Sequence, residues 1–208
     1  MRAQLEDRGP PGPSAFREQL RSVPPRDRDA WLDLALGSEE VPADGAALPR
    51  GCTPYLPCSV GALLGVIDLA RVEASDVFID VGSGIGRAAA FVHLSTGACA
   101  VGIEVQPALA AVARALTART RLSDVTFHVG DVLDRLTVLE RGTVFLLYAP
   151  FGGERLRAAL AAIEAVGRAR AVRVCTVDVP SLDERWLLHA GSSDEGVSTY
   201  FSVSPMSE

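Results

Sequence analysis

The feature that most constrains this fold is a glycine-rich turn between two apolar runs that each end in an acid. The first run ends at Asp80, and the turn that follows, residues 82–86, reads Gly-Ser-Gly-Ile-Gly. The second run ends at Glu104, at a separation close to the ~20 residues of a nucleotide-binding βαβ unit. Glycine lets the backbone turn sharply and approach a ligand, because no Cβ stands in the way. The pattern predicts a parallel α/β sheet that binds an adenosine-bearing cofactor, with Glu104 accepting hydrogen bonds from the ribose hydroxyls.

The spacing of the glycines and the acid before them bear on which cofactor the turn suits. A dinucleotide-binding turn reads G-x-G-x-x-G and brings a helix N-terminus onto a pyrophosphate, whereas this turn reads G-x-G-x-G. A carboxylate at Asp80 would repel a pyrophosphate but would suit the positively charged amino acid end of S-adenosylmethionine. A nicotinamide or flavin enzyme with a shortened turn, and a glycine turn in some other α/β protein, remain alternatives.

The rest of the chain alternates strand-like apolar runs with helical patterns, which indicates a parallel sheet with right-handed crossovers. We expect a Rossmann-like three-layer α/β sandwich whose seven-stranded, mostly parallel sheet ends in an antiparallel pair. The helix usual between the fifth and sixth strands is expected to be reduced to residues 179–184. The predicted strands are residues 77–81, 98–104, 125–129, 143–148, 171–177, 185–189 and 199–203; the helices are 14–20, 27–36, 60–72 (capped by Ser59), 86–95, one opening at Pro107, and 154–166.

The first quarter of the chain is expected to be an extension to the sheet domain. Residues 1–57 are predicted to be disordered or loosely laid on the surface to about Ser14, because of the run Gly-Pro-Pro-Gly-Pro, and then helical. Trp31 is expected to anchor the packing of this extension, which could act as a lid. Residues 58–208 form the predicted catalytic domain.

Composition excludes several classes of function. The chain has no lysine, which excludes a Schiff base or a lysine general base, and its net charge of −6 weighs against broad nucleic-acid binding. A charged start without a signal-peptide core, and no unbroken apolar span, predict a cytoplasmic protein without a membrane anchor. The four cysteines show no metal-ligand spacing, so we expect reduced thiols, no metal, and Cys99 and Cys175 buried as small hydrophobes.

Residues 80–87, Asp-Val-Gly-Ser-Gly-Ile-Gly-Arg, resemble motif I of the class I, seven-strand S-adenosylmethionine-dependent methyltransferases. The Tyr-Leu-Pro segment at residues 55–57, a helix and then this motif are similar to the non-SET protein-lysine methyltransferases. These include the disruptor-of-telomeric-silencing histone type and the small family that methylates mitochondrial proteins. The resemblance covers roughly residues 54–151 and implies methyl transfer from S-adenosylmethionine to an amine, with protein lysine as the leading acceptor.

The resemblance also implies roles for individual residues. Asp80 and the glycines would line the methionine end of the cofactor, Asp131 would lie near the adenine amino group, and Tyr55 would cover the methionine end. The alternative for Asp131 is a cap or turn aspartate, and for Tyr55 a surface loop. The expected cofactor-binding residues are Tyr55, Asp80, Gly82, Ser83, Gly84, Gly86, Glu104, Val105, Asp131 and Val132.

The segment after the fourth strand, Tyr148-Ala149-Pro150-Phe151, resembles the [Asp/Asn/Ser]-Pro-Pro-[Tyr/Phe] loop of amino-group methyltransferases. Tyr148 and Ala149 depart from that pattern, whereas Pro150 and Phe151 match it. Tyr148, Pro150 and Phe151 are the candidate catalytic residues: carbonyls of Tyr148 or Ala149 would accept from an amine, and Phe151 would stack on the substrate. The alternative is that Phe151 belongs to the core.

Other acceptors and another class of function stay open. A small molecule methylated on nitrogen or oxygen is the second acceptor class, and nucleic-acid adenine is third. An N-terminal lid over a deep pocket would favour a small molecule, and an open groove a peptide. Because the loop after the fourth strand is imperfect, a non-catalytic cofactor-binding partner subunit is the alternative to an enzyme. The sequence does not indicate the oligomeric state.

Overall fold

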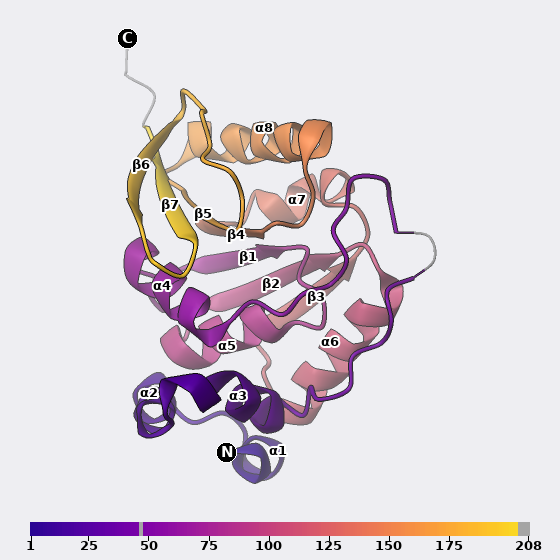
Figure 1. Ribbon diagram of the computed structural model, residues 1–208, viewed down its shortest axis with the longest axis vertical. Helices are drawn as coiled ribbons and strands as arrows, with labels where there is room; N and C mark the ends of the chain where they lie inside the picture. The colour runs from indigo at the N-terminus through magenta and orange to yellow at the C-terminus, as the bar shows by residue number, and fades with distance from the viewer. Residues whose placement is uncertain (46–47, 204–208) are drawn as a thin grey trace.

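The computed structural model describes residues 1–45 and 48–203, so residues 46–47 and 204–208 of the two predicted domains lie outside the described residues (Figure 1). The N-terminal helices are α1 (Arg2–Arg8), α2 (Pro13–Ser22), η1 (Pro25–Asp27) and α3 (Arg28–Leu36). The remaining elements are α4 (Val60–Ala70), β1 (Val77–Val81), α5 (Arg87–Thr96), β2 (Cys99–Glu104), α6 (Pro107–Thr120), β3 (Val125–Val129), η2 (Val132–Asp134), α7 (Leu136–Leu139), β4 (Val144–Tyr148), α8 (Gly153–Ala169), β5 (Arg173–Val177), β6 (Leu187–Ser192) and β7 (Val197–Ser202).

One seven-stranded sheet organises the molecule, in the order β3-β2-β1-β4-β5-β7-β6. Only β7 runs against the others, because it pairs antiparallel with both β5 and β6. The predicted Rossmann-like fold with its closing antiparallel pair is therefore confirmed. In the register of the central strands, Asp80 lies opposite Gly102 on one side and Leu146 on the other. The carboxyl ends of β1, β2 and β4 consequently meet at one edge of the sheet.

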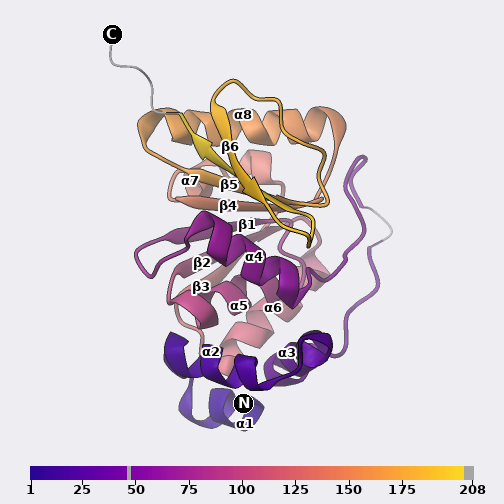
Figure 2. The same ribbon diagram turned by 60° about the vertical axis from the view of Figure 1, so that its left-hand side comes forward.

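The sheet is covered on both faces because its central strands are apolar on both sides. In β1, Phe78 belongs to a core cluster with α4, α5 and α6, whereas the next residue, Ile79, belongs to a second cluster with α7 and α8. Both side chains are fully buried. Figure 2 shows the resulting layers, with α8 above the sheet, α4 to α6 below it, and α1 to α3 beyond those helices.

The N-terminal helices form an additional layer against α5 and α6. The loose segment expected up to about Ser14 is not observed: residues Arg2–Arg8 form α1, which buries Leu5 completely and contacts α6. The glycines and prolines that suggested disorder make the link between α1 and α2 instead. Trp31 packs on Phe16 with ring centroids 5.7 Å apart, which confirms its predicted role as an anchor.

Local signals place most element boundaries within a few residues of their observed positions. Ser59 caps α4 as predicted, because its Oγ accepts a hydrogen bond from the amide of Ala62 at 3.0 Å. The residual helix expected between β5 and β6 is not formed, since residues 179–184 have no regular secondary structure, and η2 and α7 had no counterpart in the prediction. Cys175 is buried as expected, but Cys99, the first residue of β2, is exposed, so that prediction was wrong. Among the described helices, none has the length and apolar character that a membrane crossing requires.

Candidate functional site

A pocket opens at the carboxyl edge of the sheet, where ligands of parallel α/β sheets bind. Its walls are the ends of β1, β2, β4 and β5 and a segment that we call the strap (residues 48–57), which passes over this edge on its way from α3 to α4 (Figure 1). The lining residues are Leu48, Cys52, Thr53, Pro54, Tyr55, Leu56, Val81, Gly82, Ile103, Glu104, Val105, Gln106, Leu109, Gly130, Asp131, Val132, Tyr148, Ala149, Pro150, Phe151, Arg155 and Asp178.

The glycine turn has the backbone conformation that its sequence requires. Gly82, Gly84 and Gly86 have φ of 80°, 53° and 82°, a region that residues with a Cβ rarely adopt. The ring of Tyr55 lies directly against Gly84, so that a Cβ at Gly84 would collide with it. The turn therefore places the start of α5 close beneath the pocket, and the ring of Tyr55 packs over the turn.

Glu104 is held in place by the turn that precedes it in sequence. Its carboxylate accepts hydrogen bonds from the amides of Gly84 at 2.8 Å and Gln106 at 2.7 Å, one on each oxygen. Burial raises the pKa of Glu104 although these bonds favour its charged form. Each carboxylate oxygen retains a lone pair, so the group can also accept from two neighbouring hydroxyls such as those of a ribose.

Three buried polar atoms at the turn lack a partner among the described residues. They are Oδ2 of Asp80, Oγ of Ser83 and the hydroxyl of Tyr55. Burial raises the pKa of Asp80 to about 7, and the nearby Glu104 carboxylate adds to this shift. Because buried polar groups are almost always paired, these atoms fit a ligand that brings a positively charged donor, such as the amino group of S-adenosylmethionine.

Asp131 lies where the family resemblance places an adenine-binding acid, but its side chain is already engaged. One oxygen caps η2 by accepting from the amide of Leu133 at 3.1 Å, and the other forms an ion pair with Arg155 of α8. Its capping role, the alternative that the sequence left open, is therefore present. Both Asp131 and Arg155 line the pocket.

The segment after β4 joins the strap to form a second wall. The amide of Thr53 donates to the carbonyl of Pro150 at 3.0 Å, and Cys52 forms an isolated β-bridge with Phe151. Phe151 is only 8% exposed and packs in the core cluster beneath α8, while it also lines the pocket. The core role that the sequence left open for Phe151 is thus present, and Tyr148 remains the more exposed aromatic residue of this wall.

Polar contacts fix the strap and the N-terminal helices around the pocket. Asp44 accepts from Gln106 Nε2 at 2.8 Å and from the amide of Tyr55 at 3.0 Å, which ties the chain before the strap to the residue two beyond Glu104. Arg87, in the first turn of α5, pairs at 2.7 Å with both Asp29 and Asp33 of α3. These contacts hold the N-terminal extension against the glycine turn, which Arg87 follows, and against the segment that follows Glu104.

The structure brings most of the predicted site residues to this one pocket. Those that line it are Tyr55, Gly82, Glu104, Val105, Asp131, Val132, Tyr148, Pro150 and Phe151. Asp80, Ser83, Gly84 and Gly86 form the turn behind the lining. Sequence reasoning missed Gln106, Arg155 and Asp178; Asp178 follows a correctly predicted strand, and its position at the end of β5 was the available signal.

Comparison with known proteins places these residues in a wider context. A sequence model of the family described as "Histone methylation protein DOT1" matches residues 56–131, which is less than half of the chain and contains the glycine turn, Glu104 and Asp131. Comparison with curated proteins gives no significant match.

Several solved structures with a similar fold are methyltransferases. An RNA methyltransferase from Salinibacter ruber, in complex with S-adenosyl-L-homocysteine, is 24% identical, covers 74% of this chain and 96% of its own, and has a TM-score of 0.54. The putative methyltransferase yhhF from Escherichia coli is 14% identical over 77% of this chain and 89% of its own, with a TM-score of 0.56. Precorrin-6y C5,15-methyltransferase from Geobacter metallireducens GS-15 is 12% identical over 80% and 100%, with a TM-score of 0.54. The chain therefore has the Rossmann-like fold of the class I methyltransferases.

Proposed function

We propose that this protein is an S-adenosylmethionine-dependent methyltransferase that acts on an amine, with a protein lysine side chain as the leading acceptor class. The observation that carries the proposal is the hydrogen bond between the glycine turn and the acid that ends β2. The Glu104 carboxylate accepts from the amide of Gly84 and faces a pocket at the carboxyl edge of the sheet. A ribose-binding acid fixed to a glycine turn is what an adenosine-bearing cofactor needs. The match to the DOT1 family over the same residues supports this assignment.

The residues of the pocket would bind and orient the cofactor and the acceptor. S-Adenosylmethionine supplies an activated methyl group on a sulfonium, which an amine can attack in one in-line displacement. Glu104 would hold the ribose, and Asp80 and Tyr55 would surround the amino acid end. Proximity and alignment supply most of the acceleration in such a reaction, so the lack of a histidine among the described lining residues is no obstacle.

The position of the extension supports an acceptor that approaches from outside the molecule. Helices α1 to α3 contact α4, α5 and α6, and among the described residues of the extension only residues 48 and 52–56 of the strap line the pocket. The ends of β4 and β5 are not covered by these helices (Figure 2). A side chain presented by another protein could reach this part of the pocket, whereas a complete lid would favour a small molecule.

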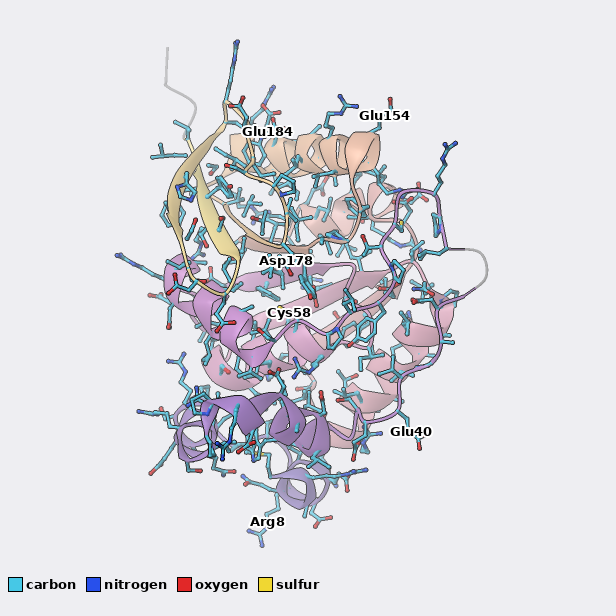
Figure 3. All side chains as sticks on the ribbon, viewed as in Figure 1. Arg8, Glu40, Cys58, Glu154, Asp178 and Glu184 are labelled. Atoms are coloured by element: carbon cyan, nitrogen blue, oxygen red, sulfur yellow. The ribbon has the colours of Figure 1, made fainter. Side chains whose placement is uncertain are left out.

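The first test is isothermal calorimetry with S-adenosylmethionine, S-adenosylhomocysteine and NAD, each titrated separately. We expect micromolar or tighter binding of the first two and none of NAD. A matched pair of variants, Glu104→Gln and Glu154→Gln, separates the site from the surface, since the Glu154 side chain is 96% exposed and points away from the pocket at the start of α8 (Figure 3). Binding of NAD alone, or of none of the three, would refute the proposal.

Turnover is then measured with radiolabelled S-adenosylmethionine against lysine-rich proteins, small amines and RNA. Incorporation that is confined to protein lysine would support the leading acceptor class. Incorporation into small amines or RNA would replace it with another acceptor. Tight cofactor binding without turnover on any of these would favour a non-catalytic partner subunit.

A further inference from the structure

An unusual backbone geometry marks the end of the pocket that is built by β4 and β5. Four non-glycine residues of the described chain have positive φ. Arg71 and Arg121 are ordinary left-handed caps at the ends of α4 and α6. The other two are Ala149, with φ 36°, and Asp178, with φ 54°, and each directly follows its strand. This conformation is strained for Ala149, whereas aspartate adopts it more readily. Such strain persists where the surrounding structure enforces it, and it concentrates at functional sites.

These two residues are neighbours in space and line the same pocket. Tyr148 lies opposite Val177 in the parallel register of β4 and β5, and the amide of Ala149 donates to the carbonyl of Val177 at 3.1 Å. The turn of Asp178 thus places its carboxylate beside the segment of Tyr148 and Ala149. Gly196, in the turn between β6 and β7, leaves room for it: a Cβ there would come within 3.0 Å of Asp178 Oδ1.

The Asp178 carboxylate is available to a ligand. Among the described residues, no hydrogen bond or ion pair engages it, and the residue is exposed at the mouth of the pocket (Figure 3). The described lining contains one cation, Arg155, which pairs with Asp131 at the opposite end. The β4–β5 end therefore carries an uncompensated negative charge, which attracts a cation and repels an anion.

This end also adjoins the place predicted for the methionine part of the cofactor. The β4 loop packs on the glycine turn, because a Cβ on Gly82 would lie 2.8 Å from Pro150 Cβ. Cys58 is labelled near Asp178 in Figure 3; burial raises the pKa of its thiol to about 12, and the carboxylates of Asp80 and Asp178 add to this shift. Asp80 Oδ2 is itself buried and unpartnered. A group bound by Asp178 would thus lie next to the methionine end, where an acceptor has to be.

We propose that Asp178 is the specificity-determining residue of the acceptor subsite, and that it binds the acceptor amine in its ammonium form beside Tyr148 and the carbonyls of the β4 loop. The ammonium releases one proton to water at the exposed Asp178 side of the pocket. The neutral amine then attacks the methyl group as the methyl–sulfur bond breaks and S-adenosylhomocysteine leaves. This inference rests on the proposed function and deepens it. Because the subsite presents a carboxylate, it selects cationic amines over neutral hydroxyl acceptors and over phosphate-bearing ones. Asp178 acts here through binding and orientation of the acceptor.

The test uses two bisubstrate ligands, so that the natural acceptor need not be known. Both are S-adenosylhomocysteine analogues in which nitrogen replaces sulfur and carries a short alkyl arm; the arm ends in an ammonium group in one and in a hydroxyl in the other. Calorimetry compares the wild-type protein with Asp178→Asn. The matched control is Asp194→Asn, which removes the same charge from an exposed turn residue that does not line the pocket.

We expect the wild-type protein and Asp194→Asn to bind the ammonium arm at least about tenfold more tightly than the hydroxyl arm, because bonds to charged groups are strong. Asp178→Asn should lose this preference and keep its affinity for S-adenosylhomocysteine. Asparagine and glycine both adopt positive φ readily, so Asp178→Asn should fold, and Asp178→Gly provides a second variant with the same expected loss.

Two results would overturn the inference while the proposed function stands. One is equal binding of the two arms by the wild-type protein, and the other is an ammonium preference that survives in both Asp178 variants. If S-adenosylhomocysteine and both analogues fail to bind the wild-type protein, the proposed function fails and the inference falls with it. The affinity for S-adenosylhomocysteine therefore distinguishes the two failures.

Discussion

The two ends of the pocket are built in different ways. At the cofactor end, the Glu104 carboxylate accepts from the amides of Gly84 and Gln106 within one βαβ unit, and the positive φ of the turn falls on glycines, which adopt it without strain. At the end proposed for the acceptor, Ala149 and Asp178 follow separate strands, have positive φ without being glycine, and meet through the pairing of β4 and β5. A shared cofactor can be held by a local motif, whereas an acceptor subsite depends on how distant loops are brought together.

The largest effect is expected where the cofactor end is fastened to the N-terminal helices. Arg87→Met should lower the free energy of unfolding by about 1.5–3 kcal/mol, because the buried carbonyl of Cys58 loses its donor and the half-exposed Asp29 and Asp33 lose their partner. Urea denaturation measures this change. The control Arg26→Met removes an exposed arginine from the same extension and should change little; equal stability of both variants would show that the extension is not coupled to the cofactor end.

The next effect concerns Glu104. Its replacement by alanine should weaken S-adenosylmethionine binding roughly ten- to a hundredfold, since a hydrogen bond to a charged group is worth about 1.5–3 kcal/mol. The ratio of the affinities for the ammonium-arm and hydroxyl-arm ligands should change little, because that ratio depends on Asp178. Calorimetry on the folded variant decides this, and an unchanged affinity would remove Glu104 from the ribose site.

The affinity for S-adenosylmethionine should depend on pH through Asp80 at the cofactor end of the pocket. Burial raises the pKa of Asp80 to about 7, so its carboxyl is largely protonated at pH 5.5. A bound ammonium group favours the ionised form, so the affinity for S-adenosylmethionine should rise on the order of tenfold between pH 5.5 and 7.5. Between pH 4 and 7 the same shift should make stability fall as pH rises, because the folded state binds more protons.

Calorimetry in matched buffers measures the affinity profile, and Asp80→Asn serves as the control. That variant cannot titrate at this position and should give a profile that is nearly flat. A flat profile in the wild-type protein would place the amino group of the cofactor away from Asp80.

The smallest effect is expected from Ala149→Gly. Glycine relieves a left-handed strain of roughly 1–2 kcal/mol but increases the entropy of the unfolded chain by about 0.4–1 kcal/mol, so a net stabilisation of up to about 1 kcal/mol should result. Turnover should fall because the β4 loop becomes less restrained. Thermal melting and kinetics measure the two effects, and a destabilised variant would show that the backbone at Ala149 is unstrained.

Local sequence patterns predicted the sheet and the glycine turn better than they predicted the N-terminal helices and the long-range contacts around the pocket. Ser59 as a cap and Asp80 at the end of β1 depend on residues within a few positions, and both were readable. Helix α1 was missed because the burial of Leu5 depends on α6, far along the chain. Capping of η2 by Asp131 could be foreseen only as an alternative, since Arg155 reaches it from α8.

The sequence by itself determined the alternation of strands and helices, the glycine turn and the acid that faces it, because periodicity and backbone freedom are local properties. The tertiary structure alone decided that Arg87 bridges to α3, that the strap pairs with the β4 loop, and that Asp178 lines the pocket without a side-chain partner within residues 1–45 and 48–203. These contacts join residues distant in sequence, and their positions follow from packing that no single segment encodes.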